Sequence, residues 1–211
     1  MEKYLSIHKN EFDRVALIDF RDVYFFADGF QTISNDEVVE TINLLHKHDM
    51  TIAVNLLVGI PFLTTKEQLE DALTSIDWCF KHNVDEIVLF PVNVKPYTLL
   101  YELYKKGEYQ EISHWLLIEV LKRVNDEYLP DIWLAWYGNR QTDYTTGEKN
   151  ITPTSCEKCE DNIMSFYKEY LASPNPARRR NLINSLIENV TCDCYQNMLK
   201  SLNNGKVRGS I

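Results

Sequence analysis

Four of the five cysteines fall in two tight pairs near the C-terminal end of the chain. Cys156 and Cys159 form a Cys-x-x-Cys pair, and Cys192 and Cys194 form a Cys-x-Cys pair after 32 intervening residues. Two closely spaced thiolates can approach one metal ion from one side, and two such pairs complete a tetrahedral shell of four sulfurs. The pattern predicts structural zinc or an iron–sulfur centre, and zinc is favoured because Cys-x-Cys is not a usual cluster spacing. The alternative is that these cysteines are unligated core residues, as we expect for Cys79.

Polar residues at the ends of predicted strands form a second set. Asp19 and Arg21 follow the first apolar run, Asn55 interrupts the second, and Asn93 follows the third. Parallel α/β sheets bind their ligands at the carboxyl ends of the strands. A buried asparagine amide needs a hydrogen-bond partner, so Asn55 is expected to contact either the backbone or a ligand.

The elements that must position these residues alternate along the chain. Apolar runs at residues 14–20, 51–58, 86–91 and 132–137 predict strands. Helical segments separate them, and two of these begin with capping-box spacing, from Ser34 to Glu37 and from Thr64 to Glu67. Strand and helix alternating at intervals of about 30 residues are typical of right-handed βαβ units on a parallel sheet. The expected fold is α/β, a partial (half) βα barrel.

Beyond the fourth strand the composition changes. The predicted division is a partial barrel at residues 1–138, a polar linker or long loop at 139–155, and a helical, cysteine-containing segment at 156–211. Helices are expected near residues 161–171 and 176–190. The basic run from Arg178 to Arg180 is predicted to be a solvated helix face.

Length and charge exclude several classes of protein. The chain has 211 residues, 45% hydrophobic and 12% aromatic, which is enough for a buried core. Its formal charge of −9 argues against a nucleic-acid partner. No apolar run is long enough for a membrane span, and the first residues do not resemble a secretory signal. Five cysteines without such a signal predict a cytoplasmic protein. Motifs of triad hydrolases, P-loop enzymes and Rossmann dinucleotide-binding proteins are absent from the sequence.

One long segment carries a family resemblance. Residues 61–109 resemble the radical S-adenosylmethionine enzymes that act on 7-deazaguanine bases, namely the archaeosine-forming lyase and queuine lyase. The similar elements are the sequence PFLT at residues 61–64, the sequence PVNV at residues 91–94, Thr98, Glu102 and the two trailing cysteine pairs. The similarity extends over residues 36–198.

The resemblance implies a reaction and a set of site residues. In that family a [4Fe–4S] cluster cleaves S-adenosylmethionine, and the resulting radical starts a carbon–nitrogen cleavage. Queuine, a small-molecule nucleobase, would thereby become 7-aminomethyl-7-deazaguanine for the salvage of tRNA-modification (queuosine) precursors. By the same resemblance, the cofactor would contact Asp19, Asn55, Asn93 and Val94, and the substrate would contact Arg21 and Tyr97.

The chain departs from this family at the cluster. Family members hold the cluster with CxxxCxxC after the first barrel strand, and no such triplet is present in this sequence. The chain would then be the C-terminal half of a split enzyme, a compact variant with its cluster elsewhere, or a degenerate relative.

A competing interpretation is a non-catalytic, zinc-stapled α/β scaffold or a partner subunit of a radical enzyme. Four parallel strands leave two open sheet edges, which proteins normally cover. We therefore expect a homodimer or a complex with a complementary N-terminal half-barrel chain. Binding of tRNA through the C-terminal helices is a third hypothesis, and the negative charge disfavours it.

Overall fold

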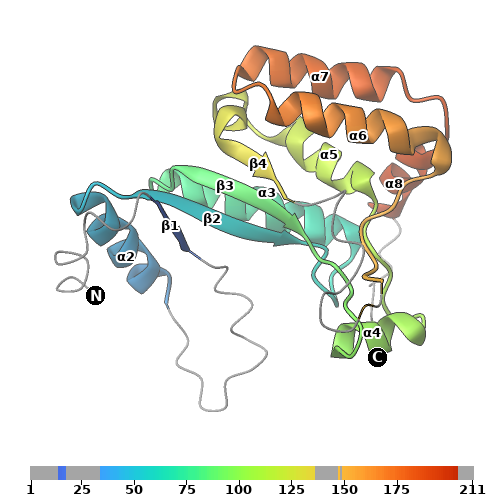
Figure 1. The fold of residues 1–211 in the computed structure, drawn as a ribbon, viewed down its shortest axis with the longest axis horizontal. Helices are drawn as coiled ribbons and strands as arrows, with labels where there is room; N and C mark the ends of the chain where they lie inside the picture. Colours follow the sequence, from blue (N-terminus) through green and yellow to red (C-terminus); the bar gives the residue numbers. More distant parts are fainter. Residues whose placement is uncertain (1–13, 18–33, 136–146, 148, 204–211) are drawn as a thin grey trace.

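Four parallel strands form one sheet in the computed structural model, which describes residues 14–17, 34–135, 147 and 149–203 (Figure 1). The strands are β1 (Arg14–Leu17), β2 (Thr51–Val58), β3 (Glu86–Pro91) and β4 (Ile132–Leu134). Asp19, Arg21 and the end of the predicted fourth strand lie outside the described residues.

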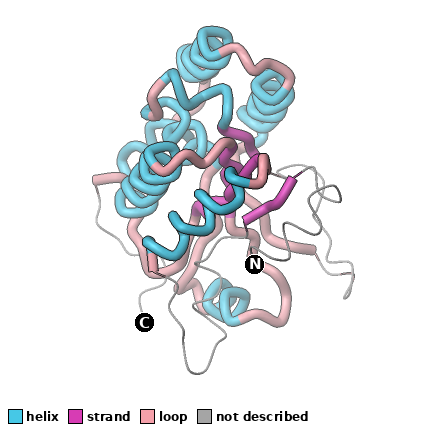
Figure 2. The backbone as a smooth tube through the Cα atoms, turned by 90° about the vertical axis from the view of Figure 1, so that its left-hand side faces the viewer, coloured by secondary structure: helices cyan, strands magenta, loops and turns pink. Residues whose placement is uncertain are grey.

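The spatial order of the strands is the same as their order along the chain, β1-β2-β3-β4. Right-handed crossovers between such strands place their connecting helices on one face of the sheet. These helices are α2 (Asn35–Lys47), α3 (Thr65–Lys81) and α5 (His114–Arg123), and their buried residues join one hydrophobic cluster with the strands. Most helices gather on one side of the strands in Figure 2. The prediction of a partial α/β barrel is confirmed.

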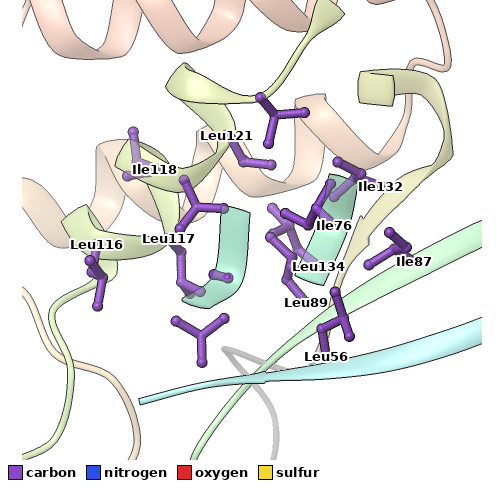
Figure 3. Close-up of a cluster of buried hydrophobic side chains, with 14 of the residues drawn as sticks. Leu56, Ile76, Ile87, Leu89, Leu116, Leu117, Ile118, Leu121, Ile132 and Leu134 are labelled. Atoms are coloured by element: carbon purple, nitrogen blue, oxygen red, sulfur yellow. The ribbon is translucent and has the colours of Figure 1, made fainter. Parts of the chain in front are cut away.

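The two faces of the sheet differ in burial. The face toward the helices carries fully buried aliphatic side chains, and Figure 3 shows them meeting the side chains of α3 and α5: Leu56, Ile87, Leu89, Ile132 and Leu134. The opposite face is only half-buried, at Asn55, Val88 and Phe90. Register confirms that Asn55 and Val88 share a face, because they are paired across β2 and β3. One face of the sheet is thus covered by helices and the other only in part.

Both predicted capping boxes are present. The Glu37 N–H donates to Ser34 Oγ at 3.3 Å, and the Ser34 N–H donates back to Glu37 Oε2 at 2.7 Å. The same exchange joins Thr64 and Glu67, at 3.1 and 2.7 Å. These backbone and side-chain hydrogen bonds lower the pKa of both glutamates, because they favour the carboxylate form. The entries to α2 and α3 are therefore set by local sequence.

The helices of the C-terminal third pack on α5 and continue the core. They are α6 (Glu157–Leu171), α7 (Pro176–Glu188) and α8 (Cys194–Ser201), and their buried residues belong to the same hydrophobic cluster as the sheet. The short α4 (Leu99–Lys105) follows β3. Our sequence analysis missed α8 and a 3-10 helix, η2 (Asp126–Asp131). Of the described helices, none combines the length and apolar composition needed to cross a bilayer.

The basic run on α7 is not a solvated face, contrary to the sequence prediction. Arg178 is exposed, but Arg179 is fully buried. Its guanidinium donates to backbone carbonyls at the end of α6 and around η2, and it lies 4.2 Å from the ring centroid of Tyr170. The accepting carbonyls are those of Tyr170 (3.1 Å), Ser173 (2.5 Å), Leu129, Pro130 (3.0 Å) and Ile132 (2.9 Å). The carbonyl groups at the end of α6 and around η2 converge at this site, and a guanidinium has enough N–H donors to satisfy them.

Arg180 makes a second connection between α7 and the segment after α5. Its Nε donates to Asp126 Oδ1 at 2.6 Å, and its Nη2 donates to the Val124 carbonyl at 2.6 Å. The basic run thus joins α7 to η2 through two of its three members.

Replacing Arg179 with methionine should lower the free energy of unfolding by about 3 kcal/mol or more, because buried carbonyls lose their donors. Urea denaturation measures this loss. The matched control Arg178→Met, on the exposed neighbour, should change stability by no more than about 0.5 kcal/mol. Equal effects of the two substitutions would contradict the role assigned to Arg179.

Candidate functional site

The four paired cysteines come together where α6 and α8 begin. Cys156 is the N-cap residue of α6, Cys159 lies in the first turn of that helix, and Cys194 is the first residue of α8. Their four sulfur atoms lie within 4.8 Å of one another. The prediction that the two pairs meet is confirmed, and the group could hold a metal ion.

Among Cys156, Cys159 and Cys192, two of the three sulfur–sulfur distances fit a tetrahedral ion. Bonds of about 2.3 Å to zinc place neighbouring sulfurs about 3.8 Å apart. Cys156 Sγ lies 3.6 Å from both Cys159 Sγ and Cys192 Sγ, close to that separation. Cys159 Sγ and Cys192 Sγ are 2.8 Å apart and would have to separate by about 1 Å around a tetrahedral ion. All four thiols are free of disulfide bonds.

The thiols of the cluster differ in acidity. Hydrogen bonding, first with Cys194 and then with Cys192 and Cys159, lowers the pKa of Cys156 to about 7. Burial raises the pKa of Cys159 far above its ordinary value and that of Cys194 to about 11. Thiols this close cannot all ionise without a cation, whereas a bound dication stabilises thiolates. The donor set therefore suits a metal that accepts four sulfurs.

A polar network fixes α8 immediately after the cluster. The Tyr195 hydroxyl donates to Glu119 Oε2 on α5 at 2.7 Å and accepts from Lys122 Nζ at 2.8 Å. The Glu119 side chain is buried, and its other oxygen accepts from Arg123 Nε at 2.7 Å. Tyr195 also packs against Trp115, with ring centroids 5.2 Å apart. The position of Cys194 is thus determined by contacts between α8 and α5.

The residues predicted at the strand ends do not form one compact group. Asn55 lies in the middle of β2, opposite Val88, whereas Asn93 follows β3. Five residues of extended chain separate Val88 from Asn93, which is about 16 Å. One purine-sized base could not contact both amides, although a longer nucleoside cofactor could. Asn93 Oδ1 is buried and has no hydrogen-bond partner in the described part of the chain.

Val94 and Tyr97 have contrasting positions on the loop after β3. Val94 is fully buried, and it exchanges two backbone hydrogen bonds of 2.9 Å with Ile151. Tyr97 is 77% exposed. Their assignments to cofactor and substrate remain predictions, as do those of Asn55 and Asn93.

Two exposed apolar residues in the strand-end segments, Phe62 and Leu99, were missed by our sequence analysis. Phe62, Tyr97 and Leu99 are the exposed large hydrophobic residues among those described, and all three lie in the segments after β2 and β3. Phe62 and Tyr97 have positive φ angles, 70° and 63°. An aromatic residue rarely adopts this backbone conformation, so sequence patterns do not predict it. Such strain is often found at functional sites, which makes Phe62 a further candidate beside Tyr97.

Comparisons with known proteins give distant matches. No family model matches the chain. It is 25% identical to the archaeosine synthase subunit beta of Methanosarcina acetivorans over 141 residues, 67% of this chain and 38% of that protein. It is 27% identical to an uncharacterized protein of Methanocaldococcus jannaschii over 92 residues, 44% of this chain and 25% of that protein. The chain thus spans well under half the length of these curated relatives.

Among solved structures, a putative dihydrodipicolinate synthetase from Pseudomonas aeruginosa matches with a TM-score of 0.26 and 10% identity. The match covers 97% of this chain and 77% of that one. A likeness at this level supports no inference about function.

Metal binding at the cysteines should be visible in stability, because the site joins α6 to α8. Chelation should lower the free energy of unfolding by about 3 kcal/mol and the Tm by about 6–12 °C, measured by calorimetry. Cys156→Ser should have a lower Tm that chelator does not lower further. Cys79→Ser, a matched change outside the cluster, should keep the full response to chelator. A wild-type Tm that does not respond to chelator, in protein loaded with zinc, would contradict the site.

Proposed function

We propose that the chain acts on 7-deazaguanine bases of tRNA modification as the C-terminal half of a βα-barrel lyase. The carrying observation is an open half-barrel sheet, with strands in sequential order, in a chain similar to archaeosine synthase subunit beta over two thirds of its length. In this proposal a second chain supplies the other half of the barrel. The half-buried face of the sheet, at Asn55, Val88 and Phe90, would then line the interior.

The radical-type [4Fe–4S] cluster does not fit the residues of this chain. The sequence lacks CxxxCxxC, and four of its five cysteines are gathered at α6 and α8. A site with four cysteine ligands leaves no open coordination position for S-adenosylmethionine. In this proposal the radical-type cluster belongs to the partner chain. The four cysteines are proposed to bind structural zinc.

The contribution of this chain to the reaction would be binding, orientation and exclusion of water. Asn93 offers an amide whose buried oxygen has no hydrogen-bond partner among the described residues, and this oxygen can accept a hydrogen bond from a base or a ribose. Phe62 and Tyr97 present exposed aromatic rings beside the strand ends, where planar bases can stack. Apolar residues around a reaction site protect reactive intermediates from water.

A second function is favoured by one observation. The cysteine cluster is well formed while the radical motif is missing, which suits a zinc-stapled scaffold or partner subunit that binds neither cofactor nor base. Ligand binding distinguishes the two functions.

Asn93→Ala should weaken binding of S-adenosylmethionine or queuine by about ten- to hundredfold, because one good amide contact is worth about 1–3 kcal/mol. The fold should be unchanged. Calorimetry measures both ligands, with the chain alone and mixed with the portion of the Methanosarcina acetivorans relative outside the matched region. Asn162→Ala, on the exposed surface of α6, is the control and should bind like wild type. If the wild-type chain binds neither ligand, whether alone or mixed with that portion of the relative, the result would favour the scaffold function.

The partly uncovered sheet should also determine whether the chain forms a dimer or a complex. We expect sedimentation to show a homodimer, or a complex with the complementary chain, at micromolar concentration, because open sheet edges favour association. A stable monomer that does not associate with the complementary chain would contradict the half-barrel proposal.

A further inference from the structure

The polar segment at residues 149–155 connects the cysteine cluster to the candidate ligand site, and we call it the strap. Sequence analysis predicted this stretch to be part of a linker or long loop. In the structure, its Ile151 pairs with Val94, one residue after Asn93. The Val94 N–H donates to the Ile151 carbonyl and the Ile151 N–H to the Val94 carbonyl, both at 2.9 Å. The strap therefore holds the loop that follows β3.

The strap also holds the entry to α5. Thr154 pairs with Ser113 in a parallel bridge, in which the His114 N–H donates to the Thr154 carbonyl at 3.0 Å. The Thr154 N–H donates to the Ile112 carbonyl at 3.1 Å. Only Ser155 separates Thr154 from Cys156, the first cysteine of the cluster.

Contacts continue from this point to the end of β2. A Cβ atom added to Gly59 would lie 2.7 Å from Ile112 Cγ2, so the side chain of Ile112 sits directly against this glycine. The Tyr109 hydroxyl donates to the Gly59 carbonyl at 2.7 Å. Tyr109 and Val94 belong to one small hydrophobic cluster, against which Ile151 packs. The residues that follow β2 and β3 thus contact either the strap itself or residues that are hydrogen-bonded to the strap or packed against it.

The geometry points to regulation of the strand-end site by the metal centre: we infer that metal binding at the cysteines fixes the strap and thereby holds the loop around Asn93 in its binding position. The inference rests on the proposed metal site and the proposed ligand site. With Cys156 held, only four residues, 152–155, lie between the cluster and the Val94–Ile151 bridge. So short a tether has little conformational freedom to lose when the bridge forms. The metal would favour the bridge without touching the ligand, which is a coupling between two sites.

Hydrogen exchange tests this coupling without an activity assay. The full chain is compared as the zinc-loaded and the chelated protein, and exchange is followed at residues 92–98 and 149–155. Zinc should slow exchange in both segments by about tenfold or more, because it suppresses local opening. Amides in the middle of α3 serve as the reference, and they should be protected in both states.

Two proline variants isolate the bridge from the metal. Ile151→Pro removes the N–H that donates to Val94, and it should keep one zinc per chain while losing most of the zinc-dependent protection at residues 92–98. Thr152→Pro is the matched control, because the Thr152 N–H makes no backbone hydrogen bond within the described part of the chain. This control should keep the zinc-dependent protection.

The possible results distinguish failure of the coupling from failure of the metal site. If wild type binds one zinc but exchange at residues 92–98 is the same with and without it, the coupling is wrong and the metal site stands. If Ile151→Pro retains the full zinc effect, the strap is not the connection and the inference is again overturned. If no zinc binds, the metal site and the coupling both fail.

Discussion

Four thiols in one place are the constraint on which the C-terminal half of this protein depends. Sulfur atoms within 4.8 Å of one another repel as thiolates and satisfy each other poorly as thiols. They lie where α6 and α8 begin, and α8 in turn packs on α5 through Tyr195 and the buried Glu119. A dication bound by the four sulfurs would resolve this electrostatic conflict and would join two helices that are distant in sequence.

The other end of α6 is held by different chemistry. The Arg179 guanidinium donates hydrogen bonds to carbonyls at the end of α6, in η2 and at the start of β4. The cysteines at the start of α6 and Arg179 near its end thus fix both ends of one helix, with apolar packing between them. The strap extends the cysteine end toward the sheet, where Ile151 pairs with Val94. The helical segment is therefore connected to both ends of the sheet that it covers.

Local patterns were sufficient to predict part of this structure. Apolar runs defined β2 and β3, and capping boxes defined where α2 and α3 begin, because both signals lie within a few residues. The spacing of Cys156, Cys159, Cys192 and Cys194 predicted their convergence. Arg179 could not be predicted, because its partners are up to 50 residues away and a basic run is usually solvated. The strap and α8 depend on the same kind of long-range contact, which periodicity does not record.

X-ray absorption at the zinc edge, on the full chain loaded with one equivalent of zinc, would show whether the four cysteines bind the metal. We expect four sulfur neighbours at about 2.3 Å and no nitrogen or oxygen in the first coordination shell. Zinc bound through nitrogen and oxygen ligands, or a protein that does not retain zinc, would contradict the four-cysteine site.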